Sequence, residues 1–470
     1  MRTFIHCLAP SICLLTLAHP AGAAPFDPLD TRSLLPPPPR FETTEDGVAV
    51  PCPLPVAGTV YGVVEVVDLA LCRNPKTHET WANARAQAAL VGAARGAYLP
   101  DLDGKLATSD VRNKTGSSTV NSTSLTLSWL LYDFGARSAN LENARQLLSA
   151  ATATLDATVQ SVFLAALQAY YNTQAARAAV AAALESERAS KESLAAAETR
   201  YRVGTGTPAD RLQAQTAWSQ AVLNRIKAEG TLKNALGTLA NVMGLDAGQP
   251  LALADLPTSP PDTAFERDVD ALIVEARERR PDLKAAEAQV KAGQASVDAT
   301  RAAGLPTLSL GVGPTWQETR NTGNTATTHG NTIGLTLTIP FFSGFDTTYK
   351  VRSAQAKAES AGAQREALRQ QVALDVWTAY QNLSTSTQTI RSTADLLASA
   401  EQSERVALGR YKAGVGTILD LLNAQSALAS ARLQRIQAML DWNVSRAALA
   451  KAVGTLDSRL LHPDAAPRSP

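Results

Sequence analysis

Alternating apolar and polar positions predict β-strands in two parts of the chain. Residues 125–129 read Leu-Thr-Leu-Ser-Trp, a period of two that gives a strand one apolar face. Over 306–317, Leu308, Leu310, Val312 and Trp316 fall on one side, with Thr307 and Ser309 on the other. We expect four strands, at roughly 101–111, 122–132, 306–317 and 332–342. The almost wholly polar run from Glu318 to Asn331 is expected to form an exposed loop.

A second pattern predicts very long helices. Residues 136–203 contain neither glycine nor proline, and one continuous helix over that span would be roughly 100 Å long. A stripe recurs every seven residues along it: Leu141, Leu148, Leu155, Val162, Ala169, Ala176 and Ala183. Such a period is typical of helices packed along their length, and alanine in the stripe allows close approach. Residues 65–98 are expected to be helical too, with a break near Asn74-Pro75.

An internal repeat relates the two halves of the chain. Tyr201-Arg202-Val203-Gly204-Thr205-Gly206-Thr207 returns 210 residues later as Tyr411-Lys412-Ala413-Gly414-Val415-Gly416-Thr417, and Asp210, Leu212, Ala214 and Gln215 return as Asp420, Leu422, Ala424 and Gln425. Each half therefore reads helix, strand, strand, very long helix, glycine-containing turn, helix. We expect a first structural repeat over 61–245, a proline-containing connector over 246–265, a second repeat over 266–456 and a tail over 457–470.

The N-terminal region predicts export from the cytoplasm. Arg2, an apolar run over 5–17 and a small-residue site at 21–23 are typical of a cleaved signal peptide, which we place at 1–24. Residues 25–60 are rich in proline and are expected to form an extended strap. Cys52 and Cys72 would remain in an oxidising compartment, where either a disulfide or two unpaired thiols is compatible with the sequence.

Composition and charge exclude several classes of function. The chain carries 44 Lys plus Arg and 43 Asp plus Glu, so no net field favours nucleic acid or an anionic surface. Beyond the signal region we expect no membrane helix, because no other stretch approaches ~18 uncharged apolar residues. The mature chain retains only His78, His329 and His462, and neither a metal-ligand spacing nor a nucleophile or phosphate motif is present. We therefore expect no enzyme, no cofactor and no metal site.

Four strands cannot stand alone in lipid. A four-stranded sheet would leave two unpaired edges, whose backbone groups nothing in hydrocarbon can satisfy. Two copies would give eight strands, which side chains fill, whereas three give twelve and an aqueous lumen. We therefore expect a trimer with mixed α and transmembrane β structure, whose twelve-stranded barrel continues into a long helical barrel. A soluble β-sandwich on a helical rod is the alternative.

The layout resembles the TolC family of outer-membrane export channels. The resemblance rests on the repeat and on three motifs: Tyr-X-X-Gly-X-X-Thr-X-X-Asp at both helical turns, Leu-Tyr-Asp-Phe-Gly over 131–135 and Pro-Phe-Phe-Ser-Gly over 340–344. It covers residues 60–456. It implies a homotrimer in the outer membrane that extends into the periplasm, and that docks onto an inner-membrane transporter, either an ABC exporter or a proton-driven pump, and onto a periplasmic adaptor.

The two helical turns hold the candidate site. Thr207 and Asp210, like Thr417 and Asp420, have the spacing of a capping box, and Gly204 and Gly414 suit the preceding helix ends. The resemblance implies a further role as a periplasmic gate, in which Asp420 forms a ring that favours cations and Asp210 and Tyr411 belong to the network that holds the tip closed. Capping and gating are compatible.

Two positions depart from the family pattern. Asn423 stands where a second carboxylate ring would be, and Gly416 where the best-known member has an arginine. Selectivity should be weaker as a result. Without a lipid-attachment pattern at the signal, the resemblance favours type I protein secretion, for instance a system like the one that exports the adenylate cyclase haemolysin toxin, over drug efflux. A periplasmic adaptor, or a structural stalk without a pore, is the alternative.

Overall fold

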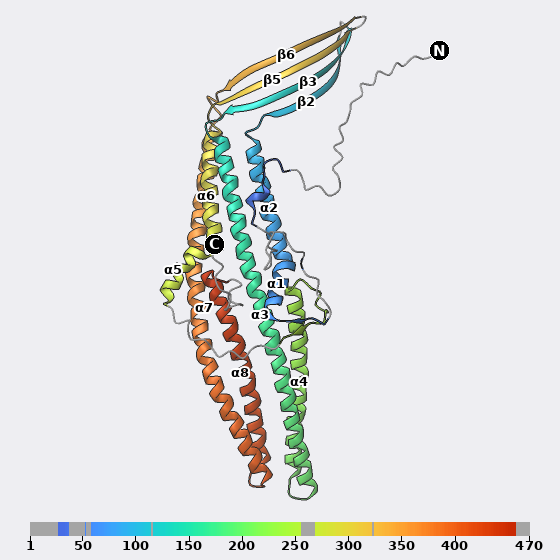
Figure 1. Ribbon diagram of the computed structural model, residues 1–470, viewed down its shortest axis with the longest axis vertical. Coiled ribbons are helices and arrows are strands. Elements are labelled where there is room, and N and C mark those ends of the chain that lie inside the picture. The colour runs from blue at the N-terminus through green and yellow to red at the C-terminus, as the bar shows by residue number, and fades with distance from the viewer. Residues whose placement is uncertain are drawn as a thin grey trace, which may run out of the picture.

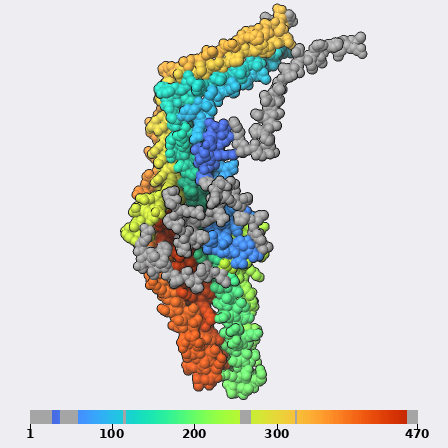
Figure 2. All heavy atoms as spheres, in the orientation of Figure 1, coloured from blue at the N-terminus to red at the C-terminus, as the bar shows by residue number. Residues whose placement is uncertain are grey.

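The computed structural model describes residues 27–36, 52, 58–113, 116–254, 268–321 and 324–456. The predicted signal peptide, the tail over 457–470 and part of the strap and connector lie outside these residues. The chain forms an elongated helical body with a β-sheet at one end and two helical turns at the other (Figure 1). The sheet is inclined to the long axis of the helices (Figure 2).

The two halves of the chain have the same order of long elements. The first half consists of α1 (Val63–Arg73), α2 (Pro75–Gly96), β2 (Asp101–Asn113), β3 (Gly116–Tyr132), α3 (Ala136–Arg202) and α4 (Pro208–Val242). The second consists of α5 (Val269–Arg279), α6 (Pro281–Ala302), β5 (Thr307–Asn321), β6 (Asn324–Thr338), α7 (Asp346–Lys412) and α8 (Ile418–Val453). The short elements are η1 (Arg32–Leu34), β1 (Val60–Tyr61) and β4 (Ala252–Leu253).

Helix α3 lies at the centre of the helical body. It packs against α2 and α6 in the half nearer the sheet and against α4 and α8 in the other half, while α7 packs against α6 and α8. Both α3 and α7 have 67 residues, close to the predicted length. The predicted stripe is buried at Leu148, Leu155, Val162, Ala169 and Ala176. The buried stripe thus changes from leucine and valine nearer the sheet to alanine from residue 169 onward, as expected.

Aromatic residues of the long helices differ from one another in burial. Phe163 and Tyr170 are buried in the largest apolar cluster, between α1, α3 and α4, where they pack the helices together. Trp377 on α7 is instead 48% exposed. This side chain is half exposed because α7 is an outer helix of the body.

The sheet is fully antiparallel, in the order β2-β3-β5-β6. The predicted loop over 318–331 is wrong: β5 runs to Asn321 and β6 begins at Asn324, and Glu318 pairs with Thr327. Likewise β3 begins at Gly116 rather than near residue 122. The hairpins are longer than expected because Thr, Ser and Asn form ladders without an apolar face, so the period of two that identifies a membrane strand is missing there.

Strand β5 contains Gly313 and Pro314 yet runs without interruption. Pro314 has no N–H, and the pairing of β3 with β5 lacks the two positions between Ser124 and Leu127. A Cβ added at Gly313 would lie 2.5 Å from the carbonyl oxygen of Leu125. The glycine therefore allows β3 to approach closely where the ladder is weakened.

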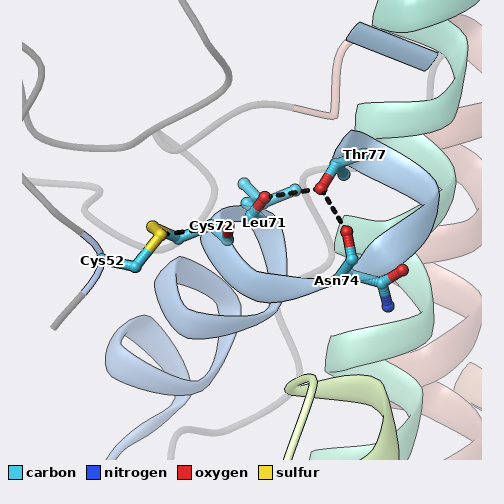
Figure 3. Close-up of a disulfide and its surroundings, with 5 residues drawn as sticks. All are labelled: Cys52, Leu71, Cys72, Asn74 and Thr77. Carbon is cyan, nitrogen blue, oxygen red and sulfur yellow. Dashed lines mark hydrogen bonds between the residues drawn. A yellow bond between two sulfur atoms is a disulfide. The ribbon is translucent and has the colours of Figure 1, made fainter. Parts of the chain in front are cut away.

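The N-terminal strap is fastened to the helical body at three places. Residues 27–36 pack on α2 and α3, where Leu34 and Leu35 contact Val91 and Leu148. A disulfide joins Cys52 to Cys72 at the end of α1, which settles the open question about these cysteines (Figure 3). Beyond it, β1 pairs with β4 in parallel.

The predicted break near Asn74-Pro75 is confirmed. Asn74 caps α2 by accepting a hydrogen bond from the backbone N–H of Lys76 at 3.0 Å, and Pro75 occupies the first helical position. The Thr77 hydroxyl donates to the carbonyl oxygens of Leu71 and Asn74, at 2.9 and 2.7 Å (Figure 3). The carbonyls freed where the chain turns from α1 to α2 are thus satisfied.

By length and composition alone, α3 contains one 18-residue window apolar enough to cross a membrane, contrary to the expectation of none. A third of that window is buried inside the chain, along the seams of the helical body. The difference arises from alanine, which raises the mean hydropathy of a packed helix. A single helix of this kind is weak support for a membrane span.

Candidate functional site

The sheet has one apolar and one polar face. Opposite residues in an antiparallel ladder lie on the same face, and one row across the four strands reads Leu102, Leu127, Val312 and Ile333. The adjacent row reads Asp101, Ser128, Gly311 and Gly334, and a further row on that side reads Lys105, Ser124, Thr315 and Gly330. The predicted sides of Leu308, Leu310, Val312 and Trp316 agree with this division.

The first strand conforms to the same division. Asp101, Asp103 and Lys105 all lie on the polar face, while Leu102 and Leu106 lie on the apolar face and are exposed in the single chain. From Leu308 to Trp316 the apolar face of β5 spans nine residues, about 26 Å along the strand. That length suits a tilted crossing of a bilayer.

Aromatic residues lie at the end of the sheet next to the helices. The indole Nε1 of Trp129 donates to the carbonyl oxygen of Tyr98 at 2.9 Å, which ties β3 to the end of α2. Phe341 and Phe342 follow β6 and are 92% and 76% exposed. Trp129 therefore has a packing role between sheet and helices, whereas the two phenylalanines have the exposure expected of interfacial anchors.

At the other end of the molecule, both helical turns have the same backbone. Gly204 and Gly414 adopt left-handed conformations, with φ of 81° and 80°, that end α3 and α7. The N–H groups of Thr205 and Gly206 bond to the carbonyl of Arg200, and those of Val415 and Gly416 bond to the carbonyl of Arg410. We call residues 203–207 the first tip and residues 413–417 the second tip.

Both expected capping boxes are present. The backbone N–H of Asp210 donates to the hydroxyl of Thr207 at 3.1 Å, and the N–H of Thr207 donates to the Asp210 carboxylate at 3.0 Å. Thr417 and Asp420 make the equivalent bonds, at 3.1 and 3.3 Å. Hydrogen bonds to Thr417, through its hydroxyl and then its backbone, hold the pKa of the Asp420 carboxyl below its ordinary value. Asp420 is thus exposed and ionised at neutral pH.

A side chain at Gly416 would be crowded by the preceding turn of α7. A Cβ at this position would lie 3.0 Å from the Cβ of Arg410 and 3.1 Å from the backbone nitrogen of Tyr411. The tip is therefore closed too tightly for a side chain to fit without adjustment. The same crowding occurs at Gly206 in the first tip.

Tyr411 is the buried centre of the tip region. Its ring is 4% exposed and packs with Ala197 of α3, Ala214 of α4 and Leu421 of α8. Burial raises the pKa of Tyr411, the charge of Arg200 opposes that shift, and the charge of Asp210 adds to it. The charge of Asp210 thus acts on Tyr411, while the Asp210 carboxylate itself accepts the hydrogen bond of the Thr207 backbone.

Arg200 was not identified from the sequence, although it joins α3 to α7 next to the two tips. Its guanidinium carbon lies 4.2 Å from the centre of the Tyr411 ring, and its Nη2 donates to the carbonyl oxygen of Tyr411. The signal that could have revealed it is the repeat, since Arg200 returns as Arg410. Further along the same seam, Ser193 of α3 and Gln425 of α8 bond at 3.1 to 3.2 Å.

The other predicted gate residues lie apart from this buried centre. Asp420 and Asn423 are exposed on α8 and line a groove with Arg410 and Ser403 of α7. The groove opens to the outside of the single chain. Among the described residues, no group of three or more metal-ligating side chains is clustered.

Comparison with known proteins identifies the family. The family model described as outer membrane efflux protein matches residues 66–245 and again residues 272–455. Protein CyaE of Bordetella pertussis is 32% identical over 89% of this chain and 90% of its own length. Outer membrane efflux protein BepC of Brucella suis is 26% identical over 82% and 83% of the two chains. Alkaline protease secretion protein AprF of Pseudomonas aeruginosa is 27% identical over 63% and 62%.

A solved structure shares the fold. The outer-membrane channel OprN superposes with a TM-score of 0.74, at 21% identity, over 84% of this chain and 90% of that one. The relatives are channel proteins and not enzymes. The chain therefore belongs to the outer membrane efflux protein family, as a TolC-like protein of the outer membrane that extends into the periplasm.

Proposed function

We propose that three copies of this chain form one continuous duct across the outer membrane and the periplasm. The observation that carries the proposal is the open four-stranded sheet with one apolar and one polar face. Strands β2 and β6 are its edges, and neither has a second partner among the described residues. Lipid would leave their backbone groups unsatisfied, so the edges must pair with other copies.

An even number of strands makes this closure possible. Since β2 and β6 run in opposite directions, β6 of one copy can continue the antiparallel ladder with β2 of the next. Three copies give twelve strands, enough to surround a water-filled lumen. The apolar face then meets lipid, and the polar face, with Asp101, Asp103 and Lys105, lines the pore. In this proposal the repeats over 61–245 and 266–456 are the structural units that alternate around the axis.

At the periplasmic end the tips form the gate. Three copies of Asp420 would surround the narrow opening with Asn423 one turn further along α8, and an exposed carboxylate that stays ionised favours cations. Asp210, Tyr411 and the tip residues Gly204, Thr207, Gly414 and Thr417 hold the hairpins in their closed arrangement. Arg200 joins this set because it fixes α3 to α7 within each copy.

The duct is passive, and an inner-membrane transporter with a periplasmic adaptor supplies the energy. We favour type I protein secretion through an ABC exporter over drug efflux through a proton-driven pump. Support comes from the similarity to CyaE along nearly the full length and from AprF, whose name describes protease secretion. BepC, named for efflux, is the less similar relative. Deletion of the gene should abolish secretion of a toxin-sized protein and leave drug resistance unchanged; the reverse result would reassign the substrate.

The oligomer and the pore can be tested together. Protein extracted from outer membranes in mild detergent should have the mass of a trimer by native mass spectrometry, and should conduct ions in planar bilayers. A monomer that is electrically silent under these conditions would contradict the duct and favour a structural stalk.

A further inference from the structure

The seam between α3 and α8 inside the chain has a counterpart on the outside of the chain. In the half of the body that ends at the tips, the helices pack in the order α4, α3, α8, α7. The sequence repeat at offset 210 relates α3 to α7 and α4 to α8. Under this relation the inner seam, in which α3 packs against α8, corresponds to an outer seam in which α7 of one copy would pack against α4 of the next.

Four of the residues that join the inner seam are kept at the outer one. The ion pair between Glu185 of α3 and Arg432 of α8, at 3.0 Å, is not, because the corresponding residues are Asp395 and Val222. Arg200 and Tyr411 form the cation–π contact, and Ser193 and Gln425 form the hydrogen bond. A shift of 210 residues gives Arg410 and Tyr201, then Ser403 and Gln215, with all four residue types unchanged. The tips that carry these residues have matching backbones, with left-handed glycines at the same place and a capping box after each.

At the outer seam these side chains are exposed. The Tyr201 ring is 41% exposed, against 4% for Tyr411, and Arg410, Ser403 and Gln215 are also exposed. Within the part of the chain that the structure describes, no hydrogen bond or ion pair holds the side chain of Arg410, Ser403 or Gln215. The Tyr201 ring is contacted in its own chain by Arg211, whose guanidinium carbon lies 5.2 Å from the ring centre. The side chains of Arg410, Ser403 and Gln215 are open, whereas their counterparts at the inner seam are engaged.

Two apolar residues of the inner seam are replaced by charged residues at the outer seam. Leu194 and Leu421 belong to the apolar cluster at the inner seam, and their counterparts are Glu404 on α7 and Arg211 on α4. These two carry opposite charges, and the Nε of Arg211 is buried without a hydrogen-bond partner in the single chain. An apolar pair inside the chain thus corresponds to a complementary charged pair between copies.

We infer that a second copy of this chain docks on the outer seam, with Arg410 of one copy on the ring of Tyr201 in the next and Ser403 bonded to Gln215. Three contacts between copies then alternate with the three Arg200–Tyr411 contacts inside copies, and six equivalent clamps hold the closed tips. This inference rests on the proposed trimer.

Cross-linking tests the contact directly. The double variant Ser403→Cys with Gln215→Cys, treated as the assembled protein with a short bis-maleimide, should give covalent dimers and trimers on denaturing gels. The native cysteines form a disulfide and do not react. Each single variant should stay monomeric on the gel. Ser193→Cys with Gln425→Cys is the matched control, because it should cross-link within one chain. A cross-linked peptide would then be found while the protein still migrates as a monomer on the denaturing gel.

The outcomes separate this inference from the proposed function. If native mass spectrometry shows a trimer and only the control pair cross-links, the contact is wrong and the trimer stands. If the protein is a monomer, both are overturned.

A second measurement does not depend on cysteines. Arg410→Gln and Tyr201→Leu should each raise the conductance of the closed channel several-fold. The double variant should add nothing further, because both changes remove one contact. Additive effects would overturn the pairing.

Discussion

The guanidinium carbon of Arg200 lies 4.2 Å from the centre of the Tyr411 ring, so the last turn of α3 holds the last turn of α7. Arg200 also donates to the carbonyl oxygen of Tyr411, and the ring is buried among residues from four helices. A cation stacked on a desolvated ring contributes about 2 kcal/mol. This contact therefore links the two helical hairpins of the chain close to their tips.

Replacing Arg200 should loosen the closed tip. We expect Arg200→Gln to raise the conductance of the closed channel several-fold in planar bilayers, because the cation over Tyr411 and the bond to its carbonyl are lost together. Tyr411→Phe keeps the ring and should have little effect. Arg202→Gln, two residues on and exposed, is the control; an equal rise there would show that charge near the tip, and not the Tyr411 contact, sets the conductance.

Asp420 should determine ion selectivity. Asp420→Ala should lower the preference for cations, because the exposed carboxylate is lost from all three copies. Since the pKa of this group lies below its ordinary value, the wild-type preference should persist through the ordinary titration range of an aspartate, about pH 4, and decline only as the pH falls further through the depressed pKa. Thr417→Ala removes the cap and keeps the carboxylate. Unchanged selectivity in Asp420→Ala, or an equal loss in Thr417→Ala, would contradict the assignment.

The two faces of the sheet can be distinguished by paired substitutions on one strand. Leu335→Arg places a charge on the apolar face, which costs about 2–4 kcal/mol near the middle of a bilayer, and should prevent insertion. Thr336→Arg, one residue on and facing the polar side, should insert normally and shift the conductance. The fraction of trimer in outer-membrane extracts measures the insertion of each variant. Equal yields for the two variants would mean that the sheet does not face lipid.

The extent of these strands shows where sequence patterns lose their predictive value. Between Leu308 and Trp316, large apolar residues alternate with small ones, so the face of the sheet on which each residue lies could be predicted from the sequence. From Gln317 to Asn321 both faces are polar, because no hydrocarbon selects one of them, so a continuing strand could not be distinguished from a loop. Likewise the capping boxes follow from local spacing, whereas Arg200 meets Tyr411 across a separation of 211 residues. The fold follows from repeated local rules, and the contacts between hairpins do not.

The disulfide should stabilise the strap against the helical body. Cys52 and Cys72 close a segment of 20 residues, and a loop of that size contributes about 3 kcal/mol by restricting the unfolded chain. Cys52→Ser with Cys72→Ser should therefore lower the melting temperature by several degrees, and a reducing agent should have the same effect on the wild type alone. A reducing agent that also lowered the melting temperature of the double variant would assign the effect to something other than this bond.

The junction between α5 and α6 should carry an acid-sensitive link to α7. Arg280 pairs with Asp282 at 2.5 Å and with Asp375 at 2.8 Å, and its side chain is only 13% exposed. Burial raises the pKa of Asp282, but the hydrogen bonds from Arg280 outweigh it and hold the pKa below 3.8. A carboxyl whose pKa is depressed in the folded state stabilises the fold at any pH above its pKa in the unfolded chain. That contribution is lost as the pH falls through its pKa in the folded chain.

Substitution of Arg280 tests this link. Arg280→Gln should cost about 2 kcal/mol at neutral pH, because two carboxylates lose a charged donor. The difference in melting temperature between variant and wild type should then shrink as the pH falls through the depressed pKa of Asp282, because this carboxyl is then protonated in both proteins. Arg279→Gln breaks the exposed pair with Glu275 next to it and should cost about 0.5 kcal/mol. A difference between Arg280→Gln and wild type that persisted where Asp282 is protonated in both proteins would show that packing of the arginine side chain, and not its charge, fastens α6 to α7.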